Sequence, residues 1–359
     1  MTLRQHLQRA WLSRGLTARL LLPVSWIYGL LAASRRALYA AGLLKSRHFP
    51  VPVVVVGNPL VGGAGKTPLA IALVRHLKAQ GRVPAVVSRG FGRTNSACLE
   101  VLPAMGASEA GDEPLLIARA TGVPVFVAPK RPDAVEAALL AHPLTNVVIC
   151  DDGLQHYALQ RDLNIAVFDE RGVGNGWLLP AGPLREPWSC DDAPPESTVN
   201  PVGVRPVDLV IHSGNTPAFK GYASTRRLAD FARASDGREI ALTELRGKRL
   251  CAVAGIAKPQ AFFDMLASAG LALAKTYAFP DHHLYSAGEI AVASEETLLC
   301  TEKDAVKLFE VMPDAGMKLL AVPLEFMPEA GFFEAFDRLL AQADARRSPL
   351  PSPHGHKTS

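Results

Sequence analysis

Apolar positions along the chain follow two alternating patterns. Short apolar runs recur at intervals, and stretches with helical spacing follow several of them. The first run, Val53–Val56, is bounded by turn residues and predicts a buried parallel strand. Leu69, Leu73 and Leu77 then continue at the spacing of a helix face. Alternation of this kind predicts the α/β fold class, with a mostly parallel sheet covered by helices.

The same alternation continues through two series of elements. In the first series, strands are predicted at 83–88, 123–128, 146–150, 163–168 and 207–212, with helices at 113–120 and 132–141. In the second, strands are predicted at 249–254, 271–279, 297–300 and 318–322, with helices beginning near Pro259, Ser286 and Thr301. Ligands of such sheets bind beyond the carboxyl ends of the strands, so the residues that end each run are the candidates for chemistry.

A glycine-rich turn follows the Val53–Val56 strand and leads into the next helix. Backbone N–H groups of such a turn can cradle phosphates, its lysine can reach the β- and γ-phosphate oxygens, and its hydroxyl can bind Mg²⁺. The residues predicted to contact a nucleotide are Gly62, Gly63, Ala64, Gly65, Lys66 and Thr67. The strict phosphate-loop pattern has a glycine where this chain has Leu60, and an ordinary glycine-rich turn is the alternative.

Length and composition indicate a globular protein of two domains. We predict a P-loop NTPase-like nucleotide-binding domain at 46–205 and a second, smaller α/β domain at 206–343. The proline-rich stretch 191–206 predicts a loop or insertion near the junction, and the polar tail 344–359 is expected to be disordered. The five cysteines form no C-x-x-C pair, which argues against a disulfide framework or a zinc site and favours a reducing cytosol.

Charge is distributed unevenly along the chain. Residues 1–99 contain fourteen Lys and Arg and no Asp or Glu, whereas the remaining 24 basic and 34 acidic residues give 24 − 34 = −10. A basic N-terminal third indicates an anionic partner. Because basic and aromatic residues are not interleaved as in single-strand binders, a membrane surface is preferred over nucleic acid.

The N-terminal segment 1–45 is predicted to anchor the protein at a membrane. Its apolar stretch, Leu20–Ser34, has fifteen residues without charge, which is short for a spanning helix of about 20. Arginines flank it, and Trp26 and Tyr28 are of the types that settle at headgroup depth, so an interfacial anchor is predicted. A helix buried in the fold is the alternative. A signal peptide is rejected, because the phosphate loop downstream would then face a compartment without ATP.

Carboxylates follow a second predicted strand. Asp151 and Asp152 come directly after 146–150, where an acidic residue can hold Mg²⁺ in a phosphate-loop enzyme. Two adjacent aspartates are also common in turns. Asp112 precedes an apolar helical run, and the residues alone favour a helix cap there. Thr301 and Asp304 have the spacing of a capping box.

Histidines and arginines are ambiguous from the residues alone. His282 and His283 follow Asp281 after a predicted strand, which suits an oriented general base, although a structural or exposed pair is commoner. Arg89, Arg93 and Arg185 stand near glycines and strand ends, where bidentate phosphate contacts are possible.

Seven segments of the chain, in this order, resemble the tetraacyldisaccharide 4'-kinases. They are Leu-Pro-x-Ser-x-x-Tyr at 22–28, GGAGKTP at 62–68, SRGFGR at 88–93, GDEP at 111–114, DDGLQH at 151–156, LLPAGPLREP at 178–187 and DHH at 281–283, and the likeness extends through TEKDAVK at 301–307. The resemblance implies transfer of phosphate from ATP to the 4'-hydroxyl of a tetraacylated glucosamine disaccharide 1-phosphate. It also implies a lipid substrate at the cytoplasmic face of a bacterial inner membrane, with the reaction site between two α/β domains and no protein partner.

Site residues follow from the same resemblance. It implies that Lys66 binds the terminal phosphates, and that Mg²⁺ is held by Thr67, Asp151, Asp152 and Glu186. Asp152 is also included among the catalytic residues. The family's catalytic Asp–His pair corresponds to Asp112 and His282, so the apparent helix cap becomes the partner of a histidine. Substrate or phosphate contacts are expected from Arg89, Arg93, Gln155, His156 and Arg185.

Two other functions remain open at this stage. A membrane-associated ATPase acting as a regulatory or positioning switch would also need the phosphate loop and the anchor. A kinase for another small substrate could use the same scaffold, but the uncharged anchor argues against a soluble substrate. The second domain with the DHH segment favours the lipid kinase.

Overall fold

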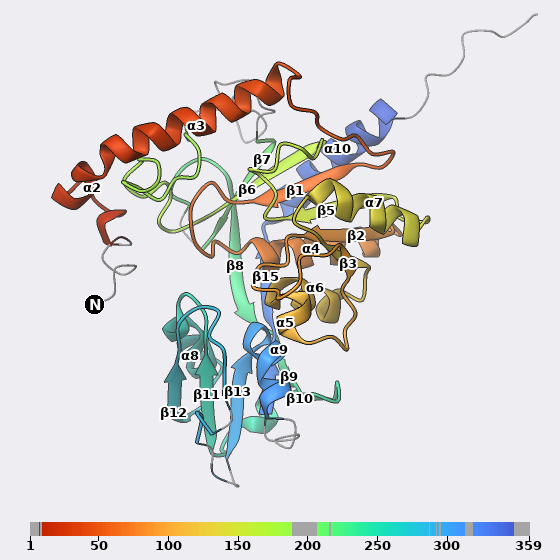
Figure 1. Ribbon diagram of the computed structural model, residues 1–359. Coiled ribbons are helices and arrows are strands. Elements are labelled where there is room, and N and C mark those ends of the chain that lie inside the picture. The colour runs from red at the N-terminus through yellow and green to blue at the C-terminus, as the bar shows by residue number, and fades with distance from the viewer. Residues whose placement is uncertain are drawn as a thin grey trace, which may run out of the picture.

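The computed structural model describes residues 7, 9–188, 207–214, 217–286, 288–291, 293, 296–312 and 319–347. Within them the chain forms a nine-stranded sheet and a six-stranded sheet, which Figure 1 shows one above the other. All of the 191–206 stretch and most of the tail predicted from the sequence lie outside the described residues.

The large sheet has the strand order β15-β8-β7-β6-β1-β5-β2-β4-β3. Its strands are β1 (Val53–Gly57), β2 (Pro84–Ser88), β3 (Leu99–Glu100), β4 (Val125–Val127), β5 (Val147–Asp151), β6 (Leu163–Asp169), β7 (Leu209–Ser213), β8 (Tyr222–Leu228) and β15 (Leu324–Pro328). The ladders are parallel except at the two edges, where β3 and β15 run antiparallel to their neighbours. The α/β fold class is therefore confirmed.

Both faces of the large sheet are covered, because successive strand residues point to opposite faces. Val54 and Val56 pack into one hydrophobic cluster and Val53 and Val55 into another. Most of the helical residues in these two clusters come from α4 (Lys66–Ala79), α5 (Ala107–Ala110), α6 (Asp112–Thr121) and α10 (Ala330–Arg347) on the first face and from α7 (Arg131–Ala141) on the second. Val306 also packs into the first cluster. Burial of every residue of β1 explains its continuous run of valines.

The small sheet has the order β10-β9-β14-β13-β11-β12. Its elements are β9 (Phe231–Arg233), β10 (Glu239–Ala241), the 3₁₀ helix η1 (Leu242–Leu245), β11 (Leu250–Ala254), α8 (Pro259–Ser268), β12 (Leu273–Ala278), β13 (Thr297–Thr301), α9 (Glu302–Val311) and β14 (Leu319–Val322). One hydrophobic cluster packs α8 against this sheet and another packs α9 against its other face. Four of its strands were predicted from the sequence, and their positions are confirmed.

Two neighbouring stretches of chain join the sheets. The chain leaves the large sheet after β8 and enters the small one at β9, and it returns from β14 directly into β15. Between them the Ala229 N–H donates to the Pro323 carbonyl oxygen (2.9 Å). The boundary predicted at residue 206 was therefore wrong: β7, β8, β15 and α10 all belong to the large domain, and the small domain spans about 229–322. The alternation of strands and helices along the sequence could not reveal this, because the residues of a strand do not indicate which sheet it joins.

Two further predictions are corrected. No helix begins at Ser286, because the described part of 286–291 forms turns. The Ser286 N–H does donate to the Glu289 carboxylate, a contact that also occurs at helix starts, but no helix follows in the described residues. The tail does not begin at Asp344, because α10 continues to Arg347, whose guanidinium hydrogen-bonds the carboxylate of Asp162. Thr301, by contrast, caps α9 as predicted, since its hydroxyl accepts from the Asp304 N–H (3.1 Å).

The N-terminal segment forms α2 (Leu16–Leu20) and α3 (Leu22–Ala40), which lies along the large domain far from the small sheet (Figure 1). Only Ser25 and Arg36 of α3 are buried, whereas Trp26, Leu30 and Leu31 are each about two-thirds exposed. A helix buried in the fold is thus excluded as the reason for this apolar stretch. Among the described residues no helix combines the length and apolar character needed to cross a bilayer.

Candidate active site

The glycine-rich turn lies at the carboxyl end of β1 and opens α4. Gly65 has φ of +98°, a region that side chains rarely adopt, and a Cβ there would lie 2.6 Å from a guanidinium nitrogen of Arg226. Lys66 and Thr67 begin the helix and are both largely buried. The backbone N–H groups at the start of α4 therefore lie at the carboxyl-end edge of the sheet, where the phosphate site was predicted.

Leu60, where the strict pattern has glycine, has a structural explanation. It is 1% exposed and pairs as an antiparallel bridge with Leu184. The Val61 N–H donates to the Pro183 carbonyl oxygen (2.9 Å), and the Arg185 N–H donates to the Pro59 carbonyl oxygen (2.7 Å). This short ladder brings the LLPAGPLREP segment, and with it Arg185, beside the glycine-rich turn.

Asp151 ends β5, next to β1 in the sheet, and is fully buried. Its Oδ2 accepts a hydrogen bond from the Thr67 hydroxyl (3.2 Å), while its Oδ1 is buried with no partner among the described residues. Burial raises the pKa of this carboxyl to about 7, with further contributions from Glu113 and Asp152 that Lys66 and Thr67 oppose. A buried carboxylate with one unused oxygen beside a hydroxyl suits a divalent cation.

Asp152 faces three cations. Its Oδ1 lies 3.1 Å from Arg185 Nη1 and 3.8 Å from Lys66 Nζ. Burial opposes ionisation of this carboxyl, but Lys66, Arg185 and Arg131 outweigh it and hold its pKa below the ordinary value. The Arg131 guanidinium also donates to the Asp152 backbone carbonyl (3.2 Å). The two neighbouring aspartates therefore differ in their surroundings. Asp151 is buried against Thr67, whereas the negative charge of Asp152 is balanced by basic side chains.

Glu186 belongs to the same network. Its Oε1 accepts from the Gln155 amide (2.8 Å) and its Oε2 from the Tyr157 hydroxyl (3.2 Å). Arg185 Nη1 in turn donates to Gln155 Oε1 (3.4 Å). The DDGLQH and LREP segments, about thirty positions apart, thus meet at one edge of the sheet.

Asp112 and His282 meet across the two domains. Asp112 is the first residue of α6 in the large domain, and its Oδ2 lies 3.2 Å from His282 Nδ1 in the small domain. The predicted helix cap was wrong, because no side chain caps α6 and the carboxylate turns toward the other domain. Burial tends to raise the pKa of this carboxyl, but hydrogen bonds from His282 and Lys307 outweigh it and leave the pKa below its ordinary value.

His283 takes no part in this contact. Its Nε2 lies 2.9 Å from Glu289 Oε1, and its ring stacks on Phe279 with centroids 4.4 Å apart. Phe91 of the SRGFGR segment instead packs edge-on against His282, at 5.7 Å between ring centroids. Within the described residues, only Asp152 and His282 among non-glycine residues have positive φ, at 52° and 64°. Two predicted site residues thus hold an uncommon backbone conformation.

The remaining arginines differ in placement. Arg93 folds back on its own loop and donates to the Ala97 carbonyl oxygen (2.9 Å), and burial lowers the pKa of its guanidinium. Arg89 is exposed at the end of β2. His156 accepts from the Arg131 N–H through Nε2 (3.2 Å), and burial, reinforced by surrounding arginines, lowers its pKa to about 4. Arg93 and His156 therefore support the loops of the site in this structure.

The helix α3 is attached to the same loops. Ser25 Oγ donates to the Leu178 carbonyl oxygen (3.0 Å) and accepts from the Ala181 N–H (2.9 Å). The Tyr28 hydroxyl donates to the Arg185 carbonyl oxygen (2.8 Å). The serine and tyrosine of the 22–28 pattern are thus the positions through which α3 holds the LLPAGPLREP segment.

Several residues at the site were missed by sequence reasoning. Lys303 and Lys307 stand one helical turn apart on α9 and both reach the Asp112–His282 pair. Their i, i+4 spacing within TEKDAVK was the available signal. Arg226, whose guanidinium donates to the Ala64 carbonyl oxygen (3.3 Å), left no local signal because it comes from β8, far along the chain.

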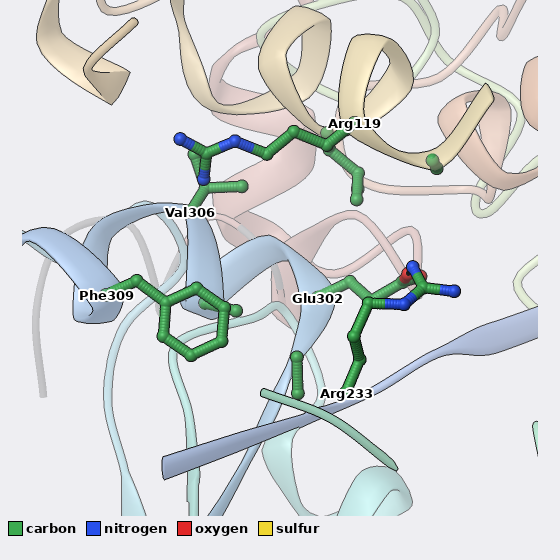
Figure 2. Close-up of a pocket in the computed structure, with 9 residues that line it drawn as sticks. Arg119, Arg233, Glu302, Val306 and Phe309 are labelled. Atoms are coloured by element: carbon green, nitrogen blue, oxygen red, sulfur yellow. Dashed lines mark ion pairs between the residues drawn. The ribbon is translucent and has the colours of Figure 1, made fainter. Parts of the chain in front are cut away.

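The domains also pack against each other behind the site. A cavity of about 70 Å³ lies between α6 and α9, lined by Leu116, Arg119 and Ala120 on one side and by residues including Val306 and Phe309 on the other. Figure 2 shows Arg119 and Val306 facing each other across it, with Glu302 and Arg233 at its edge. This cavity is too small for a nucleotide or a disaccharide. It lies where the two domains pack together, beside the Asp112–His282 pair.

Comparison with known proteins identifies the family. The model of the family described as "Tetraacyldisaccharide-1-P 4'-kinase" matches residues 17–341. The tetraacyldisaccharide 4'-kinase of Polaromonas naphthalenivorans (strain CJ2) is 56% identical over 358 residues, covering 99% of this chain and 100% of the relative. That of Acidovorax sp. (strain JS42) is 50% identical over 341 residues, covering 94% and 95%.

A solved structure agrees. The crystal structure of LpxK from Aquifex aeolicus in complex with ATP superimposes with a TM-score of 0.74 at 28% identity, covering 90% of this chain and 100% of that one. Sequence and fold therefore lead to one conclusion: the chain belongs to the tetraacyldisaccharide-1-P 4'-kinase family.

Proposed function

We propose that this protein transfers the γ-phosphate of ATP to the 4'-hydroxyl of a tetraacylated glucosamine disaccharide 1-phosphate, a step of lipid A biosynthesis. Membership of the family supports the reaction. The observation that carries the site is the contact between Asp112 and His282, which come from different domains. Glu113, the next residue along α6, lies near enough to Asp151 to help raise the pKa of that carboxyl. The acceptor would bind between the two domains, near the Asp112–His282 pair.

The chemistry requires a proton acceptor. In the transfer, the 4'-oxygen forms a bond to the γ-phosphorus, the bond from that phosphorus to the β,γ-bridging oxygen breaks, and ADP leaves. The hydroxyl proton must be accepted as the new bond forms, since a sugar hydroxyl is a poor nucleophile at neutral pH. The Asp112–His282 pair is the proposed acceptor, and such help contributes about 10²- to 10⁴-fold to the rate.

Lys66 and the glycine-rich turn would hold the triphosphate. The turn offers backbone N–H groups at the start of α4, and Lys66 is largely buried beside Asp152, positioned to neutralise phosphate charge. Arg185 and Gln155 lie in the same network as Asp152 and would contact phosphate or substrate. Arg89 is exposed and could meet the acceptor, whereas Arg93 and His156 would act by supporting their loops.

The donor set also fits Mg²⁺. The unused, buried Oδ1 of Asp151 beside the Thr67 hydroxyl is a site that a divalent cation would satisfy. Thr67, Asp151, Asp152 and Glu186 are the residues proposed to hold the ion or its waters. When bound, it would neutralise negative charge on the phosphate oxygens.

Membrane association is the remaining part of the proposal. The exposed apolar residues of α3, with arginines near both ends, suit an anionic bilayer surface. A substrate with four acyl chains leaves a bilayer at a cost of about 0.8 kcal/mol per exposed CH₂ group, so the enzyme has to reach the lipid. We infer a peripheral position at the cytoplasmic face of the inner membrane, where ATP is available.

Transfer of labelled phosphate tests the proposal directly. Purified protein is incubated with γ-labelled ATP, Mg²⁺ and tetraacyl disaccharide 1-phosphate in mixed micelles, and Asp112→Ala serves as the matched variant. We expect label in the lipid with wild type and a loss of about 10²-fold or more with the variant. ATP hydrolysis that is independent of the lipid, with no labelled lipid, would instead favour the ATPase switch.

A further inference from the structure

Two side chains from neighbouring strands hold one carbonyl group of the glycine-rich turn. Ser213 ends β7 and is buried, and its hydroxyl donates to the Ala64 carbonyl oxygen (2.6 Å). Arg226 of β8 donates through Nη2 to the same oxygen (3.3 Å) and to Ser213 Oγ (2.7 Å). Ala64 immediately precedes Gly65, so both side chains act on the peptide bond that leads into α4.

The register of the sheet explains why these two side chains meet. Ser213 lies opposite Ser224 in the parallel ladder of β7 and β8, so Arg226, two residues further along β8, projects from the same face of the sheet. Arg227 projects from the other face, where it pairs with Glu325 of β15 (2.7 Å). Of these two adjacent arginines, only Arg226 is therefore placed to reach the turn.

The lack of a side chain at Gly65 makes room for this contact. A Cβ there would lie 2.6 Å from Arg226 Nη2 and 3.3 Å from Ser213 Cβ. The guanidinium thus occupies the space that any other residue at position 65 would need. Glycine is also the residue whose backbone changes conformation most readily, so the orientation of the Ala64–Gly65 peptide has to be fixed by groups outside the turn.

The direction of the Ala64 carbonyl determines the direction of the next N–H group. This peptide bond is trans, and in a trans peptide the C=O and the N–H point in opposite directions. Because the Ala64 carbonyl points toward Ser213 and Arg226, the Gly65 N–H points away from β7 and β8. If the peptide were rotated by half a turn, a carbonyl oxygen would replace that N–H and would repel a phosphate.

We propose that Arg226 is a positioning residue for the nucleotide, which together with Ser213 keeps the Gly65 N–H directed at the triphosphate; this rests on the proposed binding of ATP at the glycine-rich turn. An arginine guanidinium is always charged. A hydrogen bond from a charged donor polarises the peptide that accepts it, and the N–H of that peptide becomes a better donor to phosphate. The positive charge beside the turn also attracts a polyanion.

Calorimetric titrations of Arg226→Met with MgATP test the proposal. The substitution removes the charge and the donors, so we expect the Kd to rise about tenfold or more. The denaturant midpoint without nucleotide should change little, because the arginine side chain is exposed. Arg226→Lys keeps a charged donor and should recover part of the affinity. Arg227→Met, which removes the neighbouring arginine on the opposite face, is the matched control and should bind MgATP like wild type.

Ser213→Ala completes a double-mutant cycle. It removes the second donor to the Ala64 carbonyl, and we expect the Kd for MgATP to rise about threefold to tenfold. Because Arg226 also donates to Ser213 Oγ, its removal already weakens the serine's contact. The double variant should therefore lose less affinity than the product of the two single losses. Losses that simply multiply would show that the two residues do not act on one peptide.

The amide signal of Gly65 gives a readout that a purely structural role would not change. Carbonyl-labelled alanine combined with nitrogen-labelled glycine selects the Ala–Gly peptides in NMR spectra, and loss of a signal in Ala64→Ser identifies that of Gly65. In wild type the amide proton should move downfield when MgADP saturates the site, since it then donates to a phosphate oxygen. In Arg226→Met, at saturation, this shift should be clearly smaller.

Four results would overturn the proposal. The first is a Kd for MgATP in Arg226→Met within about twofold of wild type, and the second is an equal loss of affinity in Arg227→Met. The third is a loss of affinity that comes with a lower denaturant midpoint, which indicates a structural role only. The fourth is the same Gly65 shift in wild type and in Arg226→Met. None of these measurements needs the lipid acceptor, so wild type that binds MgATP but labels no lipid would contradict the kinase function alone.

Discussion

The Tyr28 hydroxyl donates a hydrogen bond to the backbone carbonyl oxygen of Arg185 over 2.8 Å. Tyr28 belongs to α3, whose outer surface is apolar and exposed, and Arg185 is followed by the Glu186 proposed to hold Mg²⁺. One hydrogen bond thus joins the helix proposed to lie on the membrane to the loop proposed to hold the ion. The helix has a role inside the enzyme as well as on its surface.

Tyr28→Phe should therefore impair catalysis without unfolding the protein. A hydrogen bond of this kind contributes about 1 kcal/mol, so we expect the rate at limiting Mg²⁺ to fall about threefold to tenfold, with a smaller effect at saturating Mg²⁺. Initial rates across a Mg²⁺ series measure this. Tyr39→Phe, on the same helix, is the control, because Tyr39 contacts Tyr157 through its ring, which phenylalanine keeps. An unchanged Mg²⁺ dependence would show that Tyr28 does not position the loop.

The outer surface of α3 should determine membrane binding. Replacing Trp26 and Leu30, both 69% exposed, by serine removes apolar area but keeps Ser25 and Tyr28. At about 1.5–3 kcal/mol per fully buried large side chain, the pair should weaken binding to vesicles of phosphatidylethanolamine and phosphatidylglycerol by about tenfold or more. Vesicle sedimentation measures this, and ATP binding should not change. Leu140→Ser, on the distant α7, is the control.

Deleting residues 1–40 is a less specific experiment. It should reduce both membrane association and activity, but it also removes the contacts of Ser25 and Tyr28 with the catalytic loops. A truncated protein that is fully active on lipid without vesicles would contradict both roles of α3.

Substitutions of the two neighbouring histidines should have very different effects on turnover. His282→Ala should lower turnover by about 10²- to 10⁴-fold with little effect on ATP affinity, since it contacts Asp112 in the structure. His283→Gln should stay within about threefold of wild type, because His283 packs on Phe279 and Glu289 inside the small domain. Single-turnover rates with excess enzyme, together with ATP titrations, separate the two effects. Equal losses in both variants would contradict the assignment.

Asp151→Asn should weaken Mg²⁺-dependent nucleotide binding. The substitution keeps an oxygen near the Thr67 hydroxyl but removes the negative charge from a fully buried position. We expect the Kd for MgATP to rise at least about tenfold, while binding of ATP in the presence of a chelator changes little. Calorimetric titrations with and without Mg²⁺ measure both. Lys66→Ala, in contrast, should weaken nucleotide binding under both conditions.

The partly buried position of His156 predicts that the stability of the folded protein decreases at acidic pH. Burial, with nearby arginines, lowers its pKa to about 4, whereas an unfolded chain protonates histidine near 6.5. Stability should therefore be unaffected by this group above pH 6.5, decrease as pH falls through the window from 6.5 to 4, and lose no more below it. Because the ring is partly solvated, we expect a loss of about 1–2 kcal/mol.

His156→Gln removes this titration and should flatten the decrease. Denaturant midpoints at pH 7.5 and 5 measure the effect, and His48→Gln at an exposed position is the control. The same loss in His156→Gln as in wild type would show that another group is responsible.

Sequence reasoning predicted much of the architecture because apolar periodicity reports local burial. β1, β5 and the helix α4 lie where the valine runs and the leucine spacing placed them. The resemblance to the kinase family could also be recognised from the sequence, and the family comparison confirms it. The roles assigned to individual site residues remain predictions, although the structure brings Asp112 and His282 into contact.

The domain boundary could not be predicted in this way. β8 and β9 follow each other closely in the chain but belong to different sheets, and β15 returns to the first sheet about a hundred residues later. Strand pairing between distant segments depends on backbone hydrogen bonds that every residue type can make, so local composition does not encode it. Leu60 is a similar case, since its pairing with Leu184 explains a departure from the loop pattern that the sequence alone left unexplained.

The sequence by itself determined the class of fold, the phosphate-binding turn, the charge asymmetry and the family, because these depend on local order and residue type. Only the tertiary structure decided what surrounds the reacting groups. Lys303 and Lys307 lie about two hundred residues from Asp112, and their ammonium groups reach the Asp112–His282 pair only because α9 packs against α6. The pKa of Asp112 is lowered by groups within a few ångströms in space, and electrostatic interactions depend on such distances and on burial.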